Sequence, residues 1–153
     1  MNHPVIEVRL AGPADAEECA LVYDAALAAA FPDEPATSRD RAAYFRACAG
    51  EEQRVCLLDR VIIGFVSVYW NENFIHSLYI LPAQQKRGAG RALLAAIQAL
   101  DRGPLELKVD EVNVSARAFY ARLGWREVGE GVGDRGRWLR LRWDGFPAGL
   151  QHG

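Results

Sequence analysis

The stretch LYILPAQQKRGAGRALL, residues 78–94, decides the fold of this chain. An apolar run with strand character ends at Pro82, a short loop carries Gly88 and Gly90, and an apolar helical stripe starts at once. Glycines let the backbone approach a ligand closely, and a helix N-terminus presents free N–H groups and a partial positive charge. The junction therefore predicts an anion site of the kind that binds phosphate groups.

Two familiar phosphate-binding patterns do not match this loop. A P-loop needs Lys and then Ser or Thr after its last glycine, where this chain has Arg91 and Ala92. A dinucleotide-binding loop needs a third small residue where Leu93 stands, although Asp110 lies at a suitable distance for its acidic partner. That fold also opens with its phosphate loop, whereas about 80 residues come first here. A dinucleotide-dependent enzyme is therefore disfavoured.

The elements around this junction alternate between strands and helices. The hydrophobic pattern predicts strands at 5–10, 54–59, 61–70, 74–81, 105–109, 125–128 and 137–143, and helices at 13–30, 38–49, 90–100 and 115–123. Ser38 is a candidate N-cap for the second helix. Strand alternation places His76 on the same face as Leu78 and Ile80. The order predicts an α+β (mixed α/β) fold with one mostly antiparallel sheet and helices packed on it.

Length and composition point to an ordinary globular chain. The 153 residues predict a single domain, 1–153, with its core at about 5–143 and a tail at 144–153. Half of the residues are hydrophobic and a quarter are charged. No run approaches the roughly 18 consecutive apolar residues of a membrane span, and the first residues lack the apolar stretch of a signal peptide. We therefore expect a cytoplasmic protein with no membrane partner.

Charge and cysteine content narrow the expected partners. The net charge of −2 predicts no general affinity for nucleic acid. Residues 1–83 carry 12 acidic and 6 basic side chains, whereas residues 84–153 carry 8 acidic and 12 basic ones. A polyanion is thus expected to meet the second part of the chain, and a cation the first. The three cysteines lack the spacing of a zinc site, so no metal is expected.

Two motifs carry a resemblance to a known family. Gln85-x-x-Gly88-x-Gly90, after a strand that ends Leu78-Tyr79-Ile80-x-Pro82, resembles the acyl-CoA-binding signature of the GNAT superfamily of N-acetyltransferases. Residues 113–125, NVSARAFYARLGW, are similar to that superfamily's Asn-x-x-Ala-x-x-Phe-Tyr-x-x-x-Gly-Phe/Trp segment. The resemblance implies a GNAT-like fold, with a twisted, mostly antiparallel sheet of about six or seven strands. It also implies a split between the fourth and fifth strands, and about four flanking helices.

The resemblance further implies acetyl-CoA as a co-substrate. Its pyrophosphate is expected on the backbone amides of the loop. Its pantetheine arm is expected on the backbone of the preceding strand, which must splay from the strand at 105–109 to receive the arm. Asn113 either caps the following helix or contacts the arm. Carried over position by position, the cofactor-binding residues are Leu78, Ile80, Gln85, Lys86, Arg87, Gly88, Ala89, Gly90, Arg91 and Asn113.

Catalysis needs a proton donor for the departing CoA thiolate and a base for the amine. Tyr120 matches the tyrosine that the family places near the thioester sulfur, and a phenol can donate that proton. An amine with a pKa of about 10.4 is only about 1 in 2,500 deprotonated at pH 7, so a base is needed. His76 is the first candidate, because family members often carry a carboxylate or histidine on this strand. Glu72 and a water chain are the alternatives.

The motifs do not define the acceptor or the length of the acyl group. In the family the acceptor pocket involves the loop between the first two helices and nearby strand ends, which here gives Phe31, Glu34, Trp70 and Glu72. Acidic and aromatic side chains suit a cationic amine, so a small-molecule amine or a peptide or protein amine is expected. Family members often form dimers, which leaves a homodimer open. A non-catalytic acyl-CoA-binding sensor or partner subunit is the alternative function.

Overall fold

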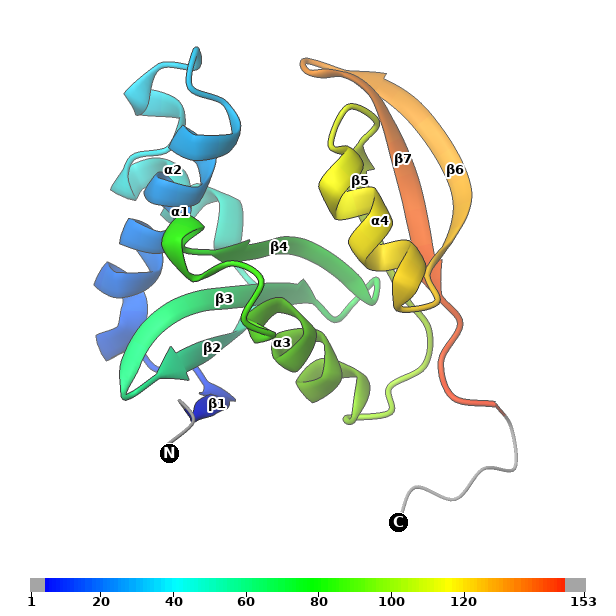
Figure 1. The fold of residues 1–153 in the computed structure, drawn as a ribbon, viewed down its shortest axis with the longest axis horizontal. Helices are drawn as coiled ribbons and strands as arrows, with labels where there is room; N and C mark the ends of the chain where they lie inside the picture. Colours follow the sequence, from blue (N-terminus) through cyan, green and yellow to red (C-terminus); the bar gives the residue numbers. More distant parts are fainter. Residues whose placement is uncertain (1–4, 148–153) are drawn as a thin grey trace.

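The computed structural model describes residues 5–147 (Figure 1), so residues 148–153 of the predicted tail lie outside it. No helix in this part of the chain is long and apolar enough to cross a membrane. The α-helices are α1 (Ala16–Ala30), α2 (Arg41–Cys48), α3 (Ala89–Gln98) and α4 (Val114–Arg122), with short 3-10 turns at Pro13–Asp15, Ala36–Ser38 and Pro82–Gln84. The strands are β1 (Ile6–Leu10), β2 (Glu52–Leu58), β3 (Val61–Tyr69), β4 (Phe74–Ile80), β5 (Leu105–Asp110), β6 (Arg126–Gly133) and β7 (Gly136–Trp143).

The strands form one seven-stranded sheet in the order β1-β2-β3-β4-β5-β7-β6. Every neighbouring pair is antiparallel except β4 and β5, which are parallel. The predicted mixed fold with a mostly antiparallel sheet is therefore confirmed.

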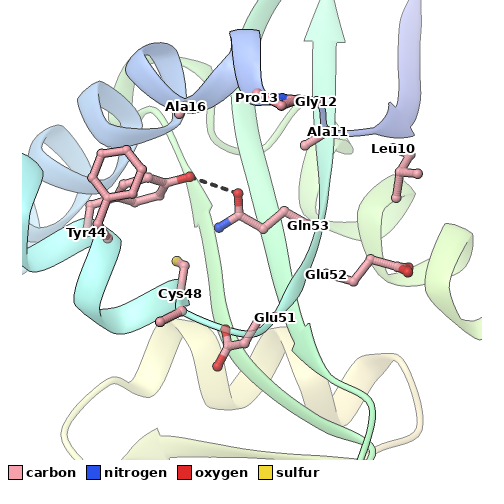
Figure 2. Close-up of a pocket in the computed structure, with 12 residues that line it drawn as sticks. Leu10, Ala11, Gly12, Pro13, Ala16, Tyr44, Cys48, Glu51, Glu52 and Gln53 are labelled. Carbon is pink, nitrogen blue, oxygen red and sulfur yellow. Dashed lines mark hydrogen bonds between the residues drawn. The ribbon is translucent and has the colours of Figure 1, made fainter.

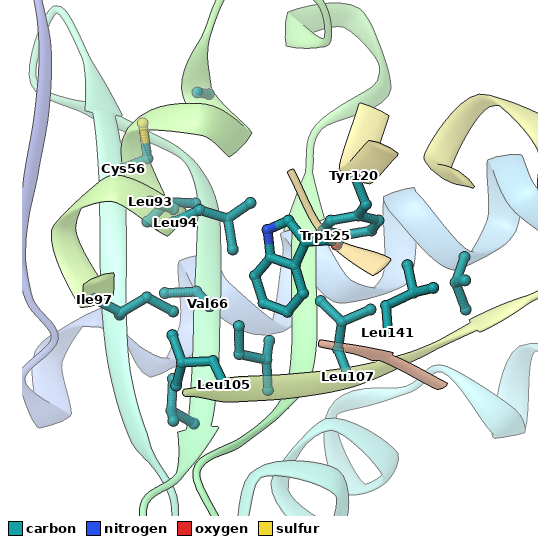
Figure 3. Close-up of a cluster of buried hydrophobic side chains, with 14 of the residues drawn as sticks. Cys56, Val66, Leu93, Leu94, Ile97, Leu105, Leu107, Tyr120, Trp125 and Leu141 are labelled. Carbon is teal, nitrogen blue, oxygen red and sulfur yellow. The ribbon is translucent and has the colours of Figure 1, made fainter. Parts of the chain in front are cut away.

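Two hydrophobic clusters attach the helices to opposite faces of the sheet. On one face α1 and α2 pack over β2 and β3, with Tyr44 and Cys48 of α2 turned towards the strands (Figure 2). On the other face Leu93 of α3 belongs to a cluster that continues through β5, α4 and β7 (Figure 3). Phe65 and Val66, neighbours on β3, belong to different clusters, as alternation along a strand requires.

The strands β4 and β5 separate soon after they meet. Their pairing is limited to Phe74 with Glu106 and Ile75 with Leu107. Beyond that point β4 remains paired with β3 as far as Ile80, and no strand among residues 5–147 lies beside its other edge. The expected split between the fourth and fifth strands is therefore present.

A β-bulge in β4 changes the direction of its side chains. The β3–β4 register shifts by one residue at His76, which has no partner on β3. The predicted alternation is therefore wrong. Leu78 and Ile80 pack with the α3 cluster, whereas His76 contacts Glu51, which follows α2.

The second helix begins later than the sequence suggested. Asp40, not Ser38, is the N-cap of α2, and its carboxylate accepts a hydrogen bond of 2.8 Å from the Ala43 N–H. The Ser38 hydroxyl instead donates to the Pro35 carbonyl oxygen at 2.7 Å. Both residue types cap helices, and this local bond keeps Ser38 in a separate short turn.

Candidate functional site

A cavity of about 710 Å³ occupies the split between β4 and β5. Its walls come from β4, the loop before α3, the first turn of α3, β5 and α4. It also reaches the C-terminal end of α1 and the turn between β6 and β7. The two motifs, about 30 residues apart in the sequence, therefore line the same cavity.

The glycine-rich loop forms one end of this cavity. Lys86 and Gly88 adopt positive φ angles of 67° and 88°, which turn the chain into α3. The Gly88 carbonyl accepts a helical hydrogen bond of 2.9 Å from the Ala92 N–H, so the N–H groups between these two residues, at the start of α3, have no helical partner. A Cβ built on Gly88 meets no atom within 4 Å, so the space beside the loop is open. The loop is therefore open to a ligand, and the anion site stays a prediction.

Gly90 serves a second purpose. A Cβ at this position would lie 3.4 Å from the Phe119 ring, so the glycine allows the first turn of α3 to approach α4 closely. Both residues line the cavity. Gly90, the second glycine of the motif, therefore has two roles. It allows α3 and α4 to pack closely, and it lets a ligand approach the backbone of the loop.

The free edge of β4 contributes backbone groups to the cavity. The Leu81 N–H donates to the Ile63 carbonyl oxygen at 2.8 Å, so it faces β3. Backbone groups of successive residues point to alternate edges of a strand. Those of Leu78 and Ile80 therefore point away from β3, into the split. These are the groups that an extended amide-containing ligand would need.

Two phenols lie at the same cavity. Tyr120 contacts Phe119 and Trp125 with ring centroids 5.1 and 5.6 Å apart. Burial raises the pKa of the Tyr120 phenol above its ordinary value, and burial raises the pKa of Tyr79 to about 12. A phenol is protonated at neutral pH already at its ordinary pKa of about 10, and the raised pKa means that each of these two holds its proton more tightly. Tyr79 belongs to the strand motif that was quoted for the resemblance, but it was not among the predicted site residues.

His76 lines the cavity at the bulge of β4. Its side chain is 42% exposed, and its ring stacks on Tyr69 with centroids 6.1 Å apart. Its Nδ1 contacts the carboxylate of Glu51, whose side chain is only 4% exposed. No motif pointed to Glu51, which lies 25 residues earlier in the chain.

An ion pair joins distant parts of the chain beside the cavity. Arg135, in the β6–β7 turn, donates from Nε and Nη2 to the two carboxylate oxygens of Glu34, each at 2.9 Å. Its guanidinium lies 3.7 Å from the centroid of the Phe31 ring. The hydrogen bond from Arg135 holds the pKa of the Glu34 carboxyl below its ordinary value. The structure thus brings Phe31 and Glu34 to this region, with the carboxylate already engaged.

Asp110 is a further cavity residue, which the sequence indicated only as the acidic partner of the disfavoured dinucleotide-binding pattern. It ends β5, and within residues 5–147 its carboxylate makes no hydrogen bond or ion pair. It does act electrostatically on Arg135. Asp110 is therefore the carboxylate in the cavity wall that is available to a cationic ligand.

Trp70 and Glu72 are not part of the cavity wall. Alternation along β3 directs Trp70 towards the α3 cluster, and its Nε1 donates to Glu52 at 3.2 Å. Glu72 is exposed in the turn between β3 and β4. The structure therefore does not bring these two predicted acceptor residues together with Phe31.

Most of the predicted cofactor residues line the cavity, with one exception. Lys86 and Arg91 contribute to its wall, whereas Arg87 does not. Asn113 is the N-cap of α4, where its side chain accepts a hydrogen bond of 3.1 Å from the Ala116 N–H, and it lines the cavity as well. The remaining predicted cofactor residues in the wall are Leu78, Ile80, Gln85, Gly88, Ala89 and Gly90.

A smaller cavity of about 390 Å³ lies beside α2 (Figure 2). The Tyr44 hydroxyl donates a hydrogen bond of 2.8 Å to Gln53 in its wall. Glu51 also lines this cavity, so its contact with His76 connects the two. Within residues 5–147, no group of three or more His, Cys, Asp or Glu is placed to hold a metal ion.

Comparison with solved structures returns similar folds over nearly the whole chain. The PaiA N-acetyltransferase of Thermoplasma acidophilum, solved in complex with coenzyme A, is 18% identical, with 92% of this chain and 99% of that chain covered and a TM-score of 0.74. YncA of Salmonella typhimurium, a putative acetyltransferase solved with its cofactor acetyl-CoA, is 18% identical, with 97% and 98% covered and a TM-score of 0.69. The ribosomal-protein-S18-alanine N-acetyltransferase of Escherichia coli is 16% identical, with 97% and 100% covered and a TM-score of 0.73.

Comparison at the level of sequence identifies the family. No curated protein matches the sequence. The sequence model described as the acetyltransferase (GNAT) family matches residues 20–125, from α1 to the residue before β6. Because this match spans more than half of the chain and includes both motifs, the chain belongs to the acetyltransferase (GNAT) family.

Proposed function

We propose that the protein is an N-acetyltransferase that transfers the acetyl group of acetyl-CoA to a primary amine by direct attack. The observation that carries the proposal is the cavity in the split sheet. One cavity collects the loop amides before α3, the free edge of β4 and the side chains of Tyr120 and His76. Family membership and structural neighbours solved with coenzyme A or acetyl-CoA support the choice of co-substrate.

The cofactor is recognised mainly by backbone in this proposal. The pyrophosphate lies against the N–H groups at the start of α3, with Lys86 and Arg91 adding positive charge. The pantetheine amides pair with the backbone of Leu78 and Ile80, which satisfies groups that the split leaves without a strand partner. The thioester then lies deep in the cavity, between the bulge of β4 and α4.

The transfer needs two proton movements. The amine nitrogen forms a bond to the thioester carbonyl carbon, and the carbon–sulfur bond then breaks. His76 accepts the proton that the amine loses, and the Tyr120 phenol gives a proton to the CoA thiolate. A phenol is protonated at neutral pH even at its ordinary pKa of about 10, and burial raises the pKa of Tyr120 further, so the phenol holds its proton until the thiolate forms.

The acceptor enters from the side of α1 and the β6–β7 turn. A protonated amine meets the Asp110 carboxylate, and the aromatic rings of Phe31 and Tyr79 contact its carbon skeleton. Arg135 engages Glu34, so Glu34 shapes this entrance rather than binding the ammonium directly. A small cationic amine and the amine of a peptide both fit this description.

The first test is a free-thiol release assay with acetyl-CoA and a panel of small amines and peptides. The wild-type protein should release CoA with particular amines, and Tyr120→Phe should lower kcat roughly 10- to 100-fold. Tyr44→Phe removes a phenol that lies outside the split, and it serves as the matched control that keeps its rate. An unaltered kcat in Tyr120→Phe would remove the phenol from the mechanism.

The same assay, together with a melting experiment, distinguishes an acetyltransferase from the alternative function. A non-catalytic acyl-CoA-binding module would show a higher melting temperature with acetyl-CoA but no thiol release with any amine of the panel. If acetyl-CoA neither binds nor turns over, the assignment of the loop at 85–91 is wrong.

A further inference from the structure

The buried carboxylate of Glu51 contacts the imidazole of His76 at the bulge of β4. Glu51 lies between α2 and β2, and 4% of its side chain is exposed. It accepts a hydrogen bond from the hydroxyl of Ser67, which is fully buried, and it contacts Nδ1 of His76. A carboxylate out of water is costly unless such partners satisfy it, so the buried Glu51 side chain depends on two contacts, one with the buried Ser67 and one with the half-exposed ring of His76.

The other contacts of His76 fix the plane of its ring. The imidazole stacks on Tyr69, with an angle of 11° between the ring planes, and tilts against Phe74 with centroids 4.8 Å apart. His76 is also the bulge residue, and bulges re-aim side chains out of the regular alternation. One ring nitrogen is thus directed at Glu51, while the residue as a whole lines the cavity.

The contact with Glu51 decides which ring nitrogen of His76 carries the hydrogen and which can accept a proton. An ionised carboxylate only accepts hydrogen bonds, so the neutral imidazole must carry its hydrogen on Nδ1 to satisfy Glu51. The lone pair is then on Nε2. No partner within residues 5–147 occupies Nε2 of His76. The ring nitrogen that can accept a proton is therefore the one that Glu51 does not engage.

We propose that Glu51 is the positioning residue of the acetyl transfer, holding His76 as the Nδ1–H tautomer so that Nε2 takes the proton from the acceptor amine. The inference rests on the proposed function, because it assigns a task to the base of that reaction. Glu51 itself touches neither the amine nor the thioester. The proton moves from the amine nitrogen to Nε2, and the hydrogen on Nδ1 remains bonded towards Glu51.

The chain offers a matched control in the next residue. Glu52 has the same side chain, but its carboxylate is engaged by Arg54 and by the Trp70 Nε1. It makes no contact with His76 among the described residues. A variant that lacks the Glu51 carboxylate loses both a negative charge and the contact with His76. A variant that lacks the Glu52 carboxylate loses only the charge as far as His76 is concerned, so the pair isolates the effect of the contact.

The tautomer is measured directly by ¹⁵N NMR of the histidine side chains at a pH where the imidazole is neutral. The His76 signal is identified by its loss in His76→Gln. We expect the wild-type ring to carry its hydrogen on Nδ1, and Glu51→Ala to move most of the population to Nε2–H. Glu52→Ala should leave the wild-type tautomer. This measurement needs no substrate, so it is independent of whether the amine has been found.

Kinetics with acetyl-CoA and an active amine give the second readout. Glu51→Ala should lower kcat about tenfold or more while the KM for acetyl-CoA stays close to the wild-type value. Glu51→Gln keeps an oxygen that can accept from Nδ1–H, so it should retain more of the rate than Glu51→Ala. Glu52→Ala should retain the full rate.

Two outcomes would overturn the inference. One is a tautomer that does not change in Glu51→Ala, or a wild-type ring that carries its hydrogen on Nε2. The other is an unaltered kcat in Glu51→Ala despite a changed tautomer. Either outcome leaves acetyl transfer standing, whereas the lack of any transfer by the wild-type protein refutes the proposed function and not the tautomer.

Discussion

The two halves of the cavity are built by different means. The half that we propose for the cofactor, called the cofactor half below, consists of the cavity-lining residues among 78–91 and the facing part of α4, and in the proposal it acts mainly through backbone groups. The half that we propose for the acceptor, called the acceptor half below, consists of the side chains of Phe31, His76, Asp110 and Arg135, which come from four separate segments. A site made of backbone depends on a few conformations of one short segment. A site made of side chains depends on the whole fold to bring its parts together.

This difference predicts that a single glycine matters most in the cofactor half. Gly88 and Gly136 both have positive φ angles, 88° and 94°, and a Cβ on either meets no atom within 4 Å. Alanine at either position should therefore cost about 1 kcal/mol of folding free energy. Only Gly88→Ala should also weaken CoA binding, by about tenfold or more, because it distorts the loop that presents the amides. Urea unfolding measures the loss of stability in each variant, and titration calorimetry measures the affinity for CoA. An equal loss of CoA affinity in Gly136→Ala would contradict the comparison.

The largest effect in the acceptor half is expected at Asp110. Asp110→Asn removes the carboxylate that meets the ammonium group, and hydrogen bonds to charged groups contribute about 1.5–3 kcal/mol. The KM for a cationic amine should rise about tenfold, with the KM for acetyl-CoA unchanged. Glu111→Gln is the control, because the neighbouring Glu111 pairs with Arg137 instead. Steady-state kinetics with both substrates varied measure the two KM values. If Asp110 instead bound the cofactor, Asp110→Asn would raise the KM for acetyl-CoA and leave the KM for the amine unchanged.

A smaller effect distinguishes the cations of the loop. Arg91 lines the cavity and Arg87 does not. Arg91→Gln should weaken CoA binding about threefold at low salt, and the loss should shrink as salt screens the charge. Arg87→Gln should change the affinity less than Arg91→Gln at every salt concentration. Equal losses in both variants would mean that the cations act through the overall field and not through the cavity wall.

The smallest effect on either half is expected from Asp15, which lies in neither. A hydrogen bond from Arg9 lowers the pKa of Asp15 from 3.8 to about 2. A depressed pKa in the folded state means that the pair stabilises the fold above about pH 3.8, and that this stability is lost as the pH falls towards 2. Asp15→Asn should cost up to about 1 kcal/mol at pH 7, because solvent screens a pair at the surface. Urea unfolding should show this difference shrinking between pH 4 and pH 2, with both ligand affinities unchanged at pH 7.

The cofactor half was largely predictable from the sequence. Its residues are nearly continuous, so the spacing of Gly88 and Gly90 after a strand already indicates the local geometry. The order of strands and helices followed from periodicity in the same way, and the split between β4 and β5 followed from the resemblance. The motif did not separate the two glycines, because the contact between Gly90 and Phe119 joins two helices.

The acceptor half was predictable only in part, because its contacts join distant segments. The Glu34–Arg135 ion pair joins residues that are 101 positions apart in the sequence. From the sequence alone, Glu34 is a loop carboxylate free to bind a cation, and only the fold shows that Arg135 pairs with it. The bulge at His76 shifts the strand by one residue, which a regular alternation cannot reveal. Glu51 and Glu52 are equivalent in the sequence, and only packing assigns the first to His76 and the second to Arg54.

The split between β4 and β5 also bears on solubility. A strand edge with unpaired backbone groups is a template for aggregation, and natural proteins usually cover or shorten such edges. Here the edge at Leu78 and Ile80 lies inside a cavity whose walls include residues of α1, α3 and α4. This edge is therefore lined by helices and does not lie at the rim of the sheet. The helices that shape the cavity therefore also shield an internal edge from pairing with other chains.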